Sequence, residues 1–142
     1  PDKKQFDIKQ LARNGTKMDG LKVLIVDDEV DVRDSMELLF ESWGCATLCA
    51  SSEQEAILKL SQSSKPQIAA IIVDYRLREN KTGLECAKNI EKHLNKNVPT
   101  LIITGETEGH IIKELEASGY PFLHKPIDAK KLSDFLYSLS DS

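Results

Sequence analysis

Apolar residues along the chain fall into short runs, which are separated by longer segments where apolar positions recur every three or four residues. Short runs rich in β-branched side chains are typical of strands that are buried on both faces. From residue 21 onward, the runs that predict strands are KVLIV (22–26), ATLCA (46–50), IAAIIV (68–73), TLIIT (100–104) and FLH (122–124).

The segments between these runs have the period of amphipathic helices. The predicted helices cover residues 30–43, 53–62, 83–94, 108–118 and 128–139. The second of them begins behind Ser52, with Glu55 three residues later, which predicts a capping box. Strands that alternate with helices predict an α/β fold, namely a flavodoxin-like, doubly wound (βα)5 domain with a five-stranded parallel sheet in the order 2-1-3-4-5.

Length and composition limit the domain organisation. The chain has 142 residues, of which 40% are hydrophobic, enough for one core but short for two domains. Residues 1–20 are polar and contain the turn signal Asn14-Gly15, so we interpret them as a linker or leader before a domain over 21–142. No apolar run has the length of a membrane span and no signal-peptide pattern opens the sequence, so we expect a cytoplasmic domain without membrane contact.

Charge and cysteine content exclude some classes of function. The net charge of −4 counts against a nucleic-acid-binding surface, because such surfaces concentrate Lys and Arg. The three cysteines are odd in number and show no CxxC spacing, which indicates reduced thiols rather than a metal site.

Polar residues stand where the predicted strands end. The first strand ends in Asp27-Asp28, the third in Asp74, the fourth in Thr104 and the fifth in Lys125-Pro126. In open α/β sheets, ligands bind outside the carboxyl ends of the strands, near the point where the strand order reverses. The sequence therefore predicts that three carboxylates, one hydroxyl and one ammonium converge on one crevice.

These residue types fit one chemistry. Three carboxylates suit Mg²⁺, which prefers oxygen ligands and shares its coordination sphere with phosphate. A carboxylate can attack phosphorus and form an aspartyl phosphate, while a cation, a lysine and a hydroxyl neutralise the phosphoryl oxygens. Taken singly, the acid pair could be a helix N-cap and the lysine a surface residue. Taken together, they predict phosphoryl transfer onto an aspartate.

The motifs VDDE, VDYRL, IITGE and HKP, in this order, resemble the receiver (response-regulator) domain of two-component signalling over residues 21 to 140. The resemblance implies that Asp74 accepts the phosphoryl group. It implies that Asp28, supported by Asp27, binds Mg²⁺ together with Asp74 and the backbone carbonyl of Arg76. We expect Arg76 and Glu106 to rim the crevice.

The same resemblance assigns the remaining roles. Lys125 would form an ion pair with the phosphoryl group, Thr104 would close on it, and the Lys125-Pro126 peptide would be cis. Phe122 stands where the family carries a mobile aromatic residue, often Tyr. Because Phe has no hydroxyl, we expect Phe122 to favour an inward position before phosphorylation, which would make a shallow switch.

Other functions remain open. A Mg²⁺-dependent phosphatase with an aspartate nucleophile could share the sheet, although the haloacid dehalogenase group places a DxD pattern on its first strand and adds a cap domain. A flavodoxin-type carrier of FMN is a third class, but the acid pair has the wrong charge to hold a phosphate.

The parent protein is also an expectation. The motifs DYRLRENKTGLE, LIITGET and GYPFLHKP together resemble receivers on the C-terminal side of hybrid sensor histidine kinases. We therefore expect a parent histidine kinase, a phosphotransferase with a membrane anchor, whose other domains precede the polar leader and which has no further domain after Ser142. A stand-alone or N-terminal receiver of a response regulator is the alternative. The implied partners are a histidine kinase or histidine phosphotransfer domain as phosphodonor, and a second copy in a weak homodimer.

Overall fold

The structure is a computed structural model that describes residues 18–63 and 67–139. Most of the predicted leader, including the turn expected at Asn14-Gly15, lies outside the described residues. Where the description begins, Met18 is already buried, and Gly20 N donates to Gly44 O at 2.9 Å. Packing of the domain therefore begins at least three residues before residue 21.

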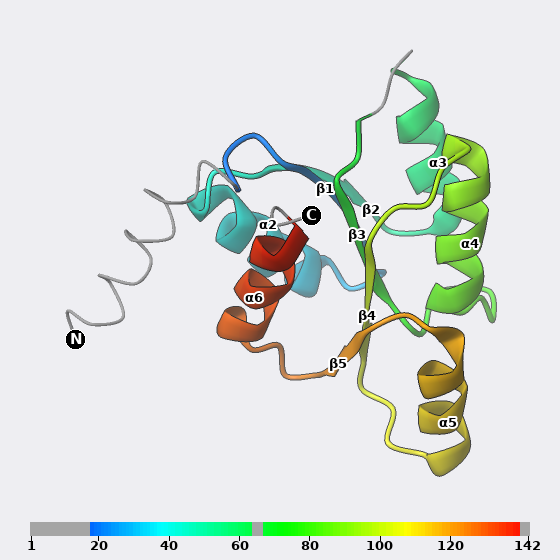
Figure 1. Cartoon of the computed structure of the whole chain (residues 1–142). Coiled ribbons are helices and arrows are strands. Elements are labelled where there is room, and N and C mark those ends of the chain that lie inside the picture. Colours follow the sequence, from blue (N-terminus) through cyan, green and yellow to red (C-terminus); the bar gives the residue numbers. More distant parts are fainter. Residues whose placement is uncertain (1–17, 64–66, 140–142) are drawn as a thin grey trace, which may run out of the picture.

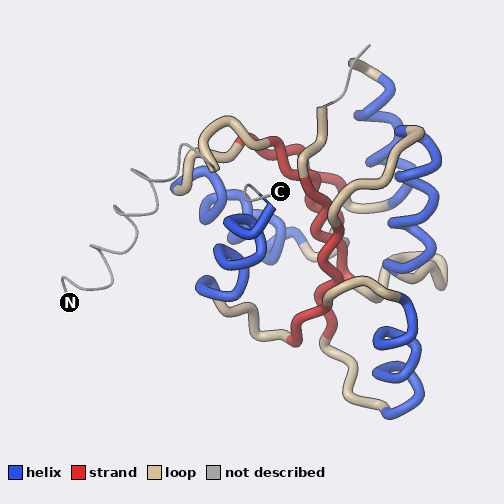
Figure 2. Tube along the Cα trace, in the orientation of Figure 1, coloured by secondary structure: helices blue, strands red, loops and turns tan. Residues whose placement is uncertain are grey.

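The sheet has five parallel strands in the order β2-β1-β3-β4-β5, which confirms the predicted topology. Figure 2 shows the strands, in red, between two groups of helices. The strands are β1 Lys22–Val26, β2 Ala46–Ala50, β3 Ala70–Asp74, β4 Thr100–Thr104 and β5 Phe122–His124. The central strands β1, β3 and β4 are almost entirely buried, as expected for strands covered on both faces.

Helices cover both faces of the sheet: α2 and α6 lie on one side, and α3, α4 and α5 on the other (Figure 1). The helices are α2 Val30–Ser42, α3 Glu53–Ser61, α4 Gly83–Leu94, α5 Gly109–Ser118 and α6 Ala129–Leu139. None of the helices in the described residues combines the length and apolar character that a membrane span needs.

Side-chain alternation along the strands divides the core into two layers. Val23, Ile25 and Ile72 pack in the cluster under α2 and α6, which we call the α2/α6 core. The apolar strand residues next to them in sequence belong to the cluster under α3, α4 and α5, as does Ile102 on β4. This two-residue period explains why the strand sequences are apolar throughout rather than alternating with polar residues.

Two local predictions need correction. The third strand was expected over residues 68–73, but β3 begins at Ala70 and includes Asp74, whose Cα pairs with Ile103. The capping box at α3 is only half formed: Ser52 accepts from Glu55 N, but the Glu55 carboxylate accepts from Ser51 N and Ser51 Oγ. A second hydroxyl directly before the cap gives that carboxylate a partner one residue further upstream.

Candidate functional site

The Lys125 side chain lies close to carboxylates at the ends of two other strands. Its Nζ lies 3.0 Å from Glu29 Oε1, 3.4 Å from Asp74 Oδ2 and 3.8 Å from Asp27 Oδ2. The proximity of Asp27, Asp74 and Lys125 expected from the topology is thus present in the structure. Alternation also accounts for the side on which Asp74 lies, since it follows Ile72 by two residues and so shares the face of the α2/α6 core.

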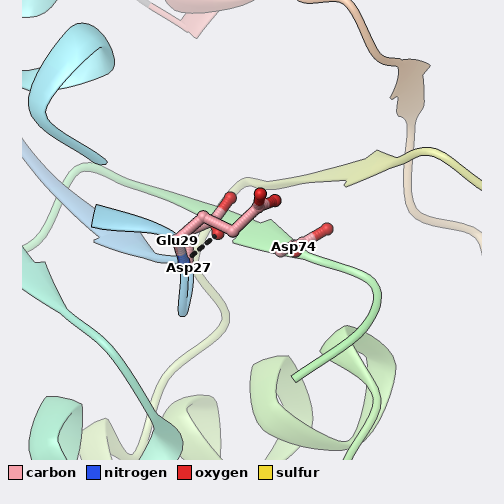
Figure 3. Close-up of side chains that lie close together, drawn as sticks. All are labelled: Asp27, Glu29 and Asp74. Carbon is pink, nitrogen blue, oxygen red and sulfur yellow. Dashed lines mark hydrogen bonds between the residues drawn. The ribbon is translucent and has the colours of Figure 1, made fainter. Parts of the chain in front are cut away.

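Three carboxylates form the acidic part of the site. Oxygen atoms of Asp27, Glu29 and Asp74 lie within 4.8 Å of one another, the first two at the end of β1 and the third at the end of β3 (Figure 3). Asp27 Oδ1 accepts a hydrogen bond from Glu29 N at 2.8 Å. Asp27 Oδ2 is buried and has no hydrogen-bond partner among the described residues. A buried carboxylate oxygen facing two further carboxylates fits a hard divalent cation such as Mg²⁺.

Burial and mutual repulsion oppose ionisation of the two buried aspartates. Burial is the largest cause of the raised pKa of Asp74, which reaches about 7, and the charge of Asp27 adds to it against the attraction of Lys125. The pKa of Asp27 is also raised, chiefly by burial, although the hydrogen bond from Glu29 N opposes the rise. A cation in the site would favour the ionised form of both groups.

Lys125, whose side chain is partly buried, offsets part of this negative charge. Burial alone lowers the pKa of its ammonium group, but the hydrogen bond to Glu29 and the charges of Asp74 and Asp27 outweigh it and raise the pKa. The Lys125-Pro126 peptide bond is cis, as expected. One ammonium group therefore lies close to three carboxylates, and the local charge is negative.

Two of the predicted metal ligands are not among these three carboxylates. Asp28 is only partly buried and is not a member of the group of three close carboxylates. The side chain of Arg76 is exposed and forms an ion pair with Glu106, with Nε 2.9 Å from Oε2. Arg76 and Glu106 thus meet across the rim of the site, while the roles of Asp28 and of the Arg76 carbonyl as ligands stay predictions.

Thr104 and Asp74 stand on opposite faces of the sheet. Thr104 follows Ile102 by two residues, so alternation places its side chain on the face of α3, α4 and α5. Thr104 is fully buried, and its Oγ1 accepts from Glu106 N at 2.8 Å. Phe122 is half-buried on the same side, with its ring edge toward His124 and the two centroids 5.9 Å apart. The predicted movement of Thr104 therefore has to carry its hydroxyl around the end of β4.

Two residues that shape the site, Gly83 and Glu29, were not predicted. Gly83 begins α4 and donates its N–H to Tyr75 O at 2.7 Å, and a Cβ at Gly83 would lie 2.5 Å from Asp74 O. Only glycine permits this approach of α4 to the end of β3. Thr82 and Glu85 complete a capping box at the same helix end. The start of this helix at residue 83 was predicted, and Thr82 with Glu85 three residues later could also have indicated its capping box. Glu29 could have been included from its place after the acid pair.

Comparison with known proteins identifies the family and the fold. The model of the response regulator receiver domain family matches residues 23–137. The chain is 36% identical over 104 residues to the transcriptional regulatory protein YdfI of Bacillus subtilis, covering 70% of this chain and 46% of YdfI. It is 28% identical over 117 residues to the phosphate regulon transcriptional regulatory protein PhoB of Pseudomonas aeruginosa, covering 81% of this chain and 49% of PhoB.

Solved structures give the same result. The chemotaxis response regulator CheY4 of Vibrio cholerae is similar with a TM-score of 0.69 and 28% identity, over 84% of this chain and 98% of that one. CheY of Borrelia burgdorferi, solved in a complex with CheX, BeF₃ and Mg²⁺, has a TM-score of 0.70 and 26% identity, over 84% of this chain and 88% of that one. The chain spans about half the length of the first curated relatives it matches.

Proposed function

The chain belongs to the response regulator receiver domain family, and on that premise we propose that it accepts a phosphoryl group on Asp74. One observation supports this most directly: Asp74 is buried at the end of β3, with its Oδ2 3.4 Å from the ammonium group of Lys125 and close to Asp27, whose Oδ2 has no hydrogen-bond partner among the described residues. A nucleophilic carboxylate needs both a cation to keep it ionised and a fixed positive charge for the incoming phosphoryl oxygens.

The chemistry follows from these positions. A bond forms between an Asp74 carboxylate oxygen and phosphorus while the phosphorus–nitrogen bond of a phosphohistidine donor breaks. Mg²⁺ held by Asp27, Asp28 and Asp74, with Glu29 in reach, would neutralise charge on the carboxylates and the phosphoryl oxygens. Lys125 leaves Glu29 to pair with a phosphoryl oxygen.

The Thr104 hydroxyl also has a place in this chemistry. It donates to another phosphoryl oxygen, and to reach it Thr104 gives up its contact with Glu106 N.

A groove next to the site supports a protein donor. It has a volume of about 400 Å³ and lies between α2 and the connection from β5 to α6, with Lys125 at its edge. Val32, Met36 and Leu132 are among the apolar residues that line it. An apolar groove beside the attacking group suits a helix of a histidine kinase or of a histidine phosphotransfer domain, which would bring its phosphohistidine toward Asp74.

For the parent protein, the comparisons favour the alternative over the hybrid kinase expected from the motifs. YdfI, PhoB and CheY4 are named as regulators, and none of these names describes a kinase. A receiver of a response regulator therefore replaces the hybrid histidine kinase as the preferred context.

Phosphorylation with a small donor tests the proposal. Incubated with Mg²⁺ and acetyl phosphate, the domain should gain one phosphoryl group that is labile in base. Asp74→Asn should abolish the gain, whereas Asp34→Asn, which changes an exposed aspartate on α2, should not. Persistent labelling of the Asp74→Asn variant contradicts the assignment. Steady turnover of a generic phosphate ester would instead support the aspartate-nucleophile phosphatase.

A further inference from the structure

Tyr75, the residue after Asp74, is a buried phenol that the phosphoryl chemistry does not use. Its side chain is 4% exposed, and its Oη donates a hydrogen bond to Glu114 Oε1 at 2.5 Å. Glu114 lies on α5, which is reached along the chain only through α4 and β4 (Figure 1). A hydrogen bond to an ionised acceptor belongs to the stronger kind. The neighbour of the acceptor therefore connects β3 directly to α5.

The backbone of Tyr75 is held on two sides. Tyr75 N donates to Ile103 O on β4 at 2.8 Å, and Tyr75 O accepts from Gly83 N on α4 at 2.7 Å. Because Gly83 has no room for a side chain against Asp74 and Tyr75, this junction cannot shift without moving β3, β4 and α4 together. The phenol thus extends from a rigid point toward α5.

Two buried side chains hold α5 against the rest of the domain. Its buried residues are Ile111 and Leu115, and the side chain of its N-cap, Glu108, makes no capping hydrogen bond. A helix with few buried contacts opens locally at low free energy, so one strong hydrogen bond makes up a large share of what keeps it in place. The position of α5 is therefore sensitive to the Tyr75–Glu114 bond.

A second set of contacts leads from Tyr75 to Thr104. The guanidinium carbon of Arg76 lies 5.7 Å from the centroid of the Tyr75 ring. Arg76 pairs with Glu106, and Glu106 N donates to Thr104 Oγ1. The ring that holds α5 is thus covered by a side chain whose partner is bonded to the hydroxyl at the end of β4.

On the basis of the proposed function, we propose that Tyr75 is a positioning residue. It holds α5 in the position seen in the unphosphorylated domain and releases it when Asp74 is phosphorylated. Thr104 gives up Glu106 N as its hydroxyl turns to the phosphoryl group. The added negative charge draws Arg76 from Glu106 and off the Tyr75 ring. Water then competes for the Tyr75–Glu114 hydrogen bond, and α5 loosens.

Hydrogen exchange of the α5 amides in Tyr75→Phe tests this coupling, measured in the whole chain with and without beryllofluoride and Mg²⁺. In the free protein we expect protection in α5 to fall roughly 10-fold, the size of one hydrogen bond to a charged group. In the beryllofluoride-treated protein, where the bond is already weakened, we expect a loss below about 2-fold. Labelling of Asp74 by acetyl phosphate should be retained at the wild-type level or above, because the phenol does not touch the carboxylate and its hydrogen bond favours the resting state.

The chain offers a matched control and a second variant. Tyr120→Phe removes a hydrogen bond of the same kind, from Tyr120 Oη to Glu91 Oε1 on α4; because Tyr120 lies just after α5, any loss of protection should stay in the last turn of α5. Glu114→Ala changes an exposed residue and should reproduce the effect of Tyr75→Phe. The two changes combined should add little to either alone, because both remove one bond.

Two results would overturn this role of Tyr75. Unchanged protection of α5 in free Tyr75→Phe and Glu114→Ala would show that the bond does not hold the helix. Equal losses in the free and treated protein, with a wild-type protein that responds to beryllofluoride, would leave Tyr75 as a static anchor that phosphorylation does not release. A wild-type protein that does not respond to beryllofluoride at all contradicts the proposed function itself.

Discussion

Replacing Asp74 by asparagine should stabilise the metal-free domain, and the gain should depend on pH. Asp74 is buried beside Asp27, and its pKa is raised from 3.8 to about 7, with burial as the largest cause. The carboxylate is therefore harder to ionise in the folded protein than in the unfolded chain. A group of this kind contributes its full stability below pH 3.8, and that stability is lost as the pH rises through about 7.

The size of the effect follows from the same pKa. Moving it from 3.8 to about 7 corresponds to at most about 4 kcal/mol of unfolding free energy at alkaline pH. Asparagine is nearly the same shape and does not ionise, so Asp74→Asn removes this cost. Lys125 keeps Glu29 and Asp27 as partners in the variant, so no buried charge loses its last counterion.

Urea unfolding at pH 5, 6, 7 and 8 in the presence of a chelator measures this effect. We expect the free energy of unfolding of Asp74→Asn to exceed that of the wild type by a margin that grows from pH 5 to pH 8. Asp34→Asn, on the exposed face of α2, should show no such trend. Added Mg²⁺ should reduce the margin, because a cation at 100 times its dissociation constant stabilises the wild type by about 2.7 kcal/mol.

A constant difference between the two proteins from pH 5 to pH 8 would refute the reasoning. It would mean that Asp74 ionises as easily in the folded domain as in the unfolded chain, and that the acid cluster exerts no strain at neutral pH. An unchanged margin on adding Mg²⁺ would mean that the cation does not bind at Asp74.

Three further substitutions or measurements follow from the site. Asp28→Ala should weaken Mg²⁺ affinity about 10-fold or more, lower phosphorylation with it, and raise the melting temperature in metal-free buffer by relieving repulsion; a lower melting temperature would show that Asp28 is structural. Gly83→Ala should destabilise the domain by about 2 kcal/mol or more, since its Cβ would lie 2.5 Å from Asp74 O. Gly109→Ala, in open space at the start of α5, should be neutral or slightly stabilising, and similar urea midpoints for both variants would contradict the close approach. Amide chemical shifts around Phe122 should change little on adding beryllofluoride if the ring is inward at rest, and a large change would contradict the shallow switch.

The fold could be predicted almost completely because two periods determine it. A five-residue apolar run such as TLIIT can only be buried on both faces, and the helical period of residues 83–94 matches α4 from its first residue to its last. The strand ends then followed from topology, which brought Asp27, Asp74 and Lys125 together without any knowledge of side chains.

The details of the site beyond the strand ends could not be predicted in this way. Glu29 lies three residues past the end of β1, where the turn into α2 and not the sheet decides which carboxylate faces Lys125. The same holds for Tyr75, whose ring position depends on how α4 docks through Gly83. Sequence periods describe elements, whereas these contacts depend on the angles between elements.

The placement of Asp74 and Thr104 on opposite faces of the sheet decides what kind of signal the site can send. A phosphoryl group on Asp74 adds about −1.5 to −2 charges on the side of α2 and α6. The groups that can respond are Lys125, which already lies there, and Thr104, which has to come around the end of β4 from the side of α3, α4 and α5. The charge is therefore neutralised on one face of the sheet, while the space that Thr104 leaves opens on the other face. For that reason, the proposed response reaches Tyr75 and α5 rather than the helices next to the acceptor.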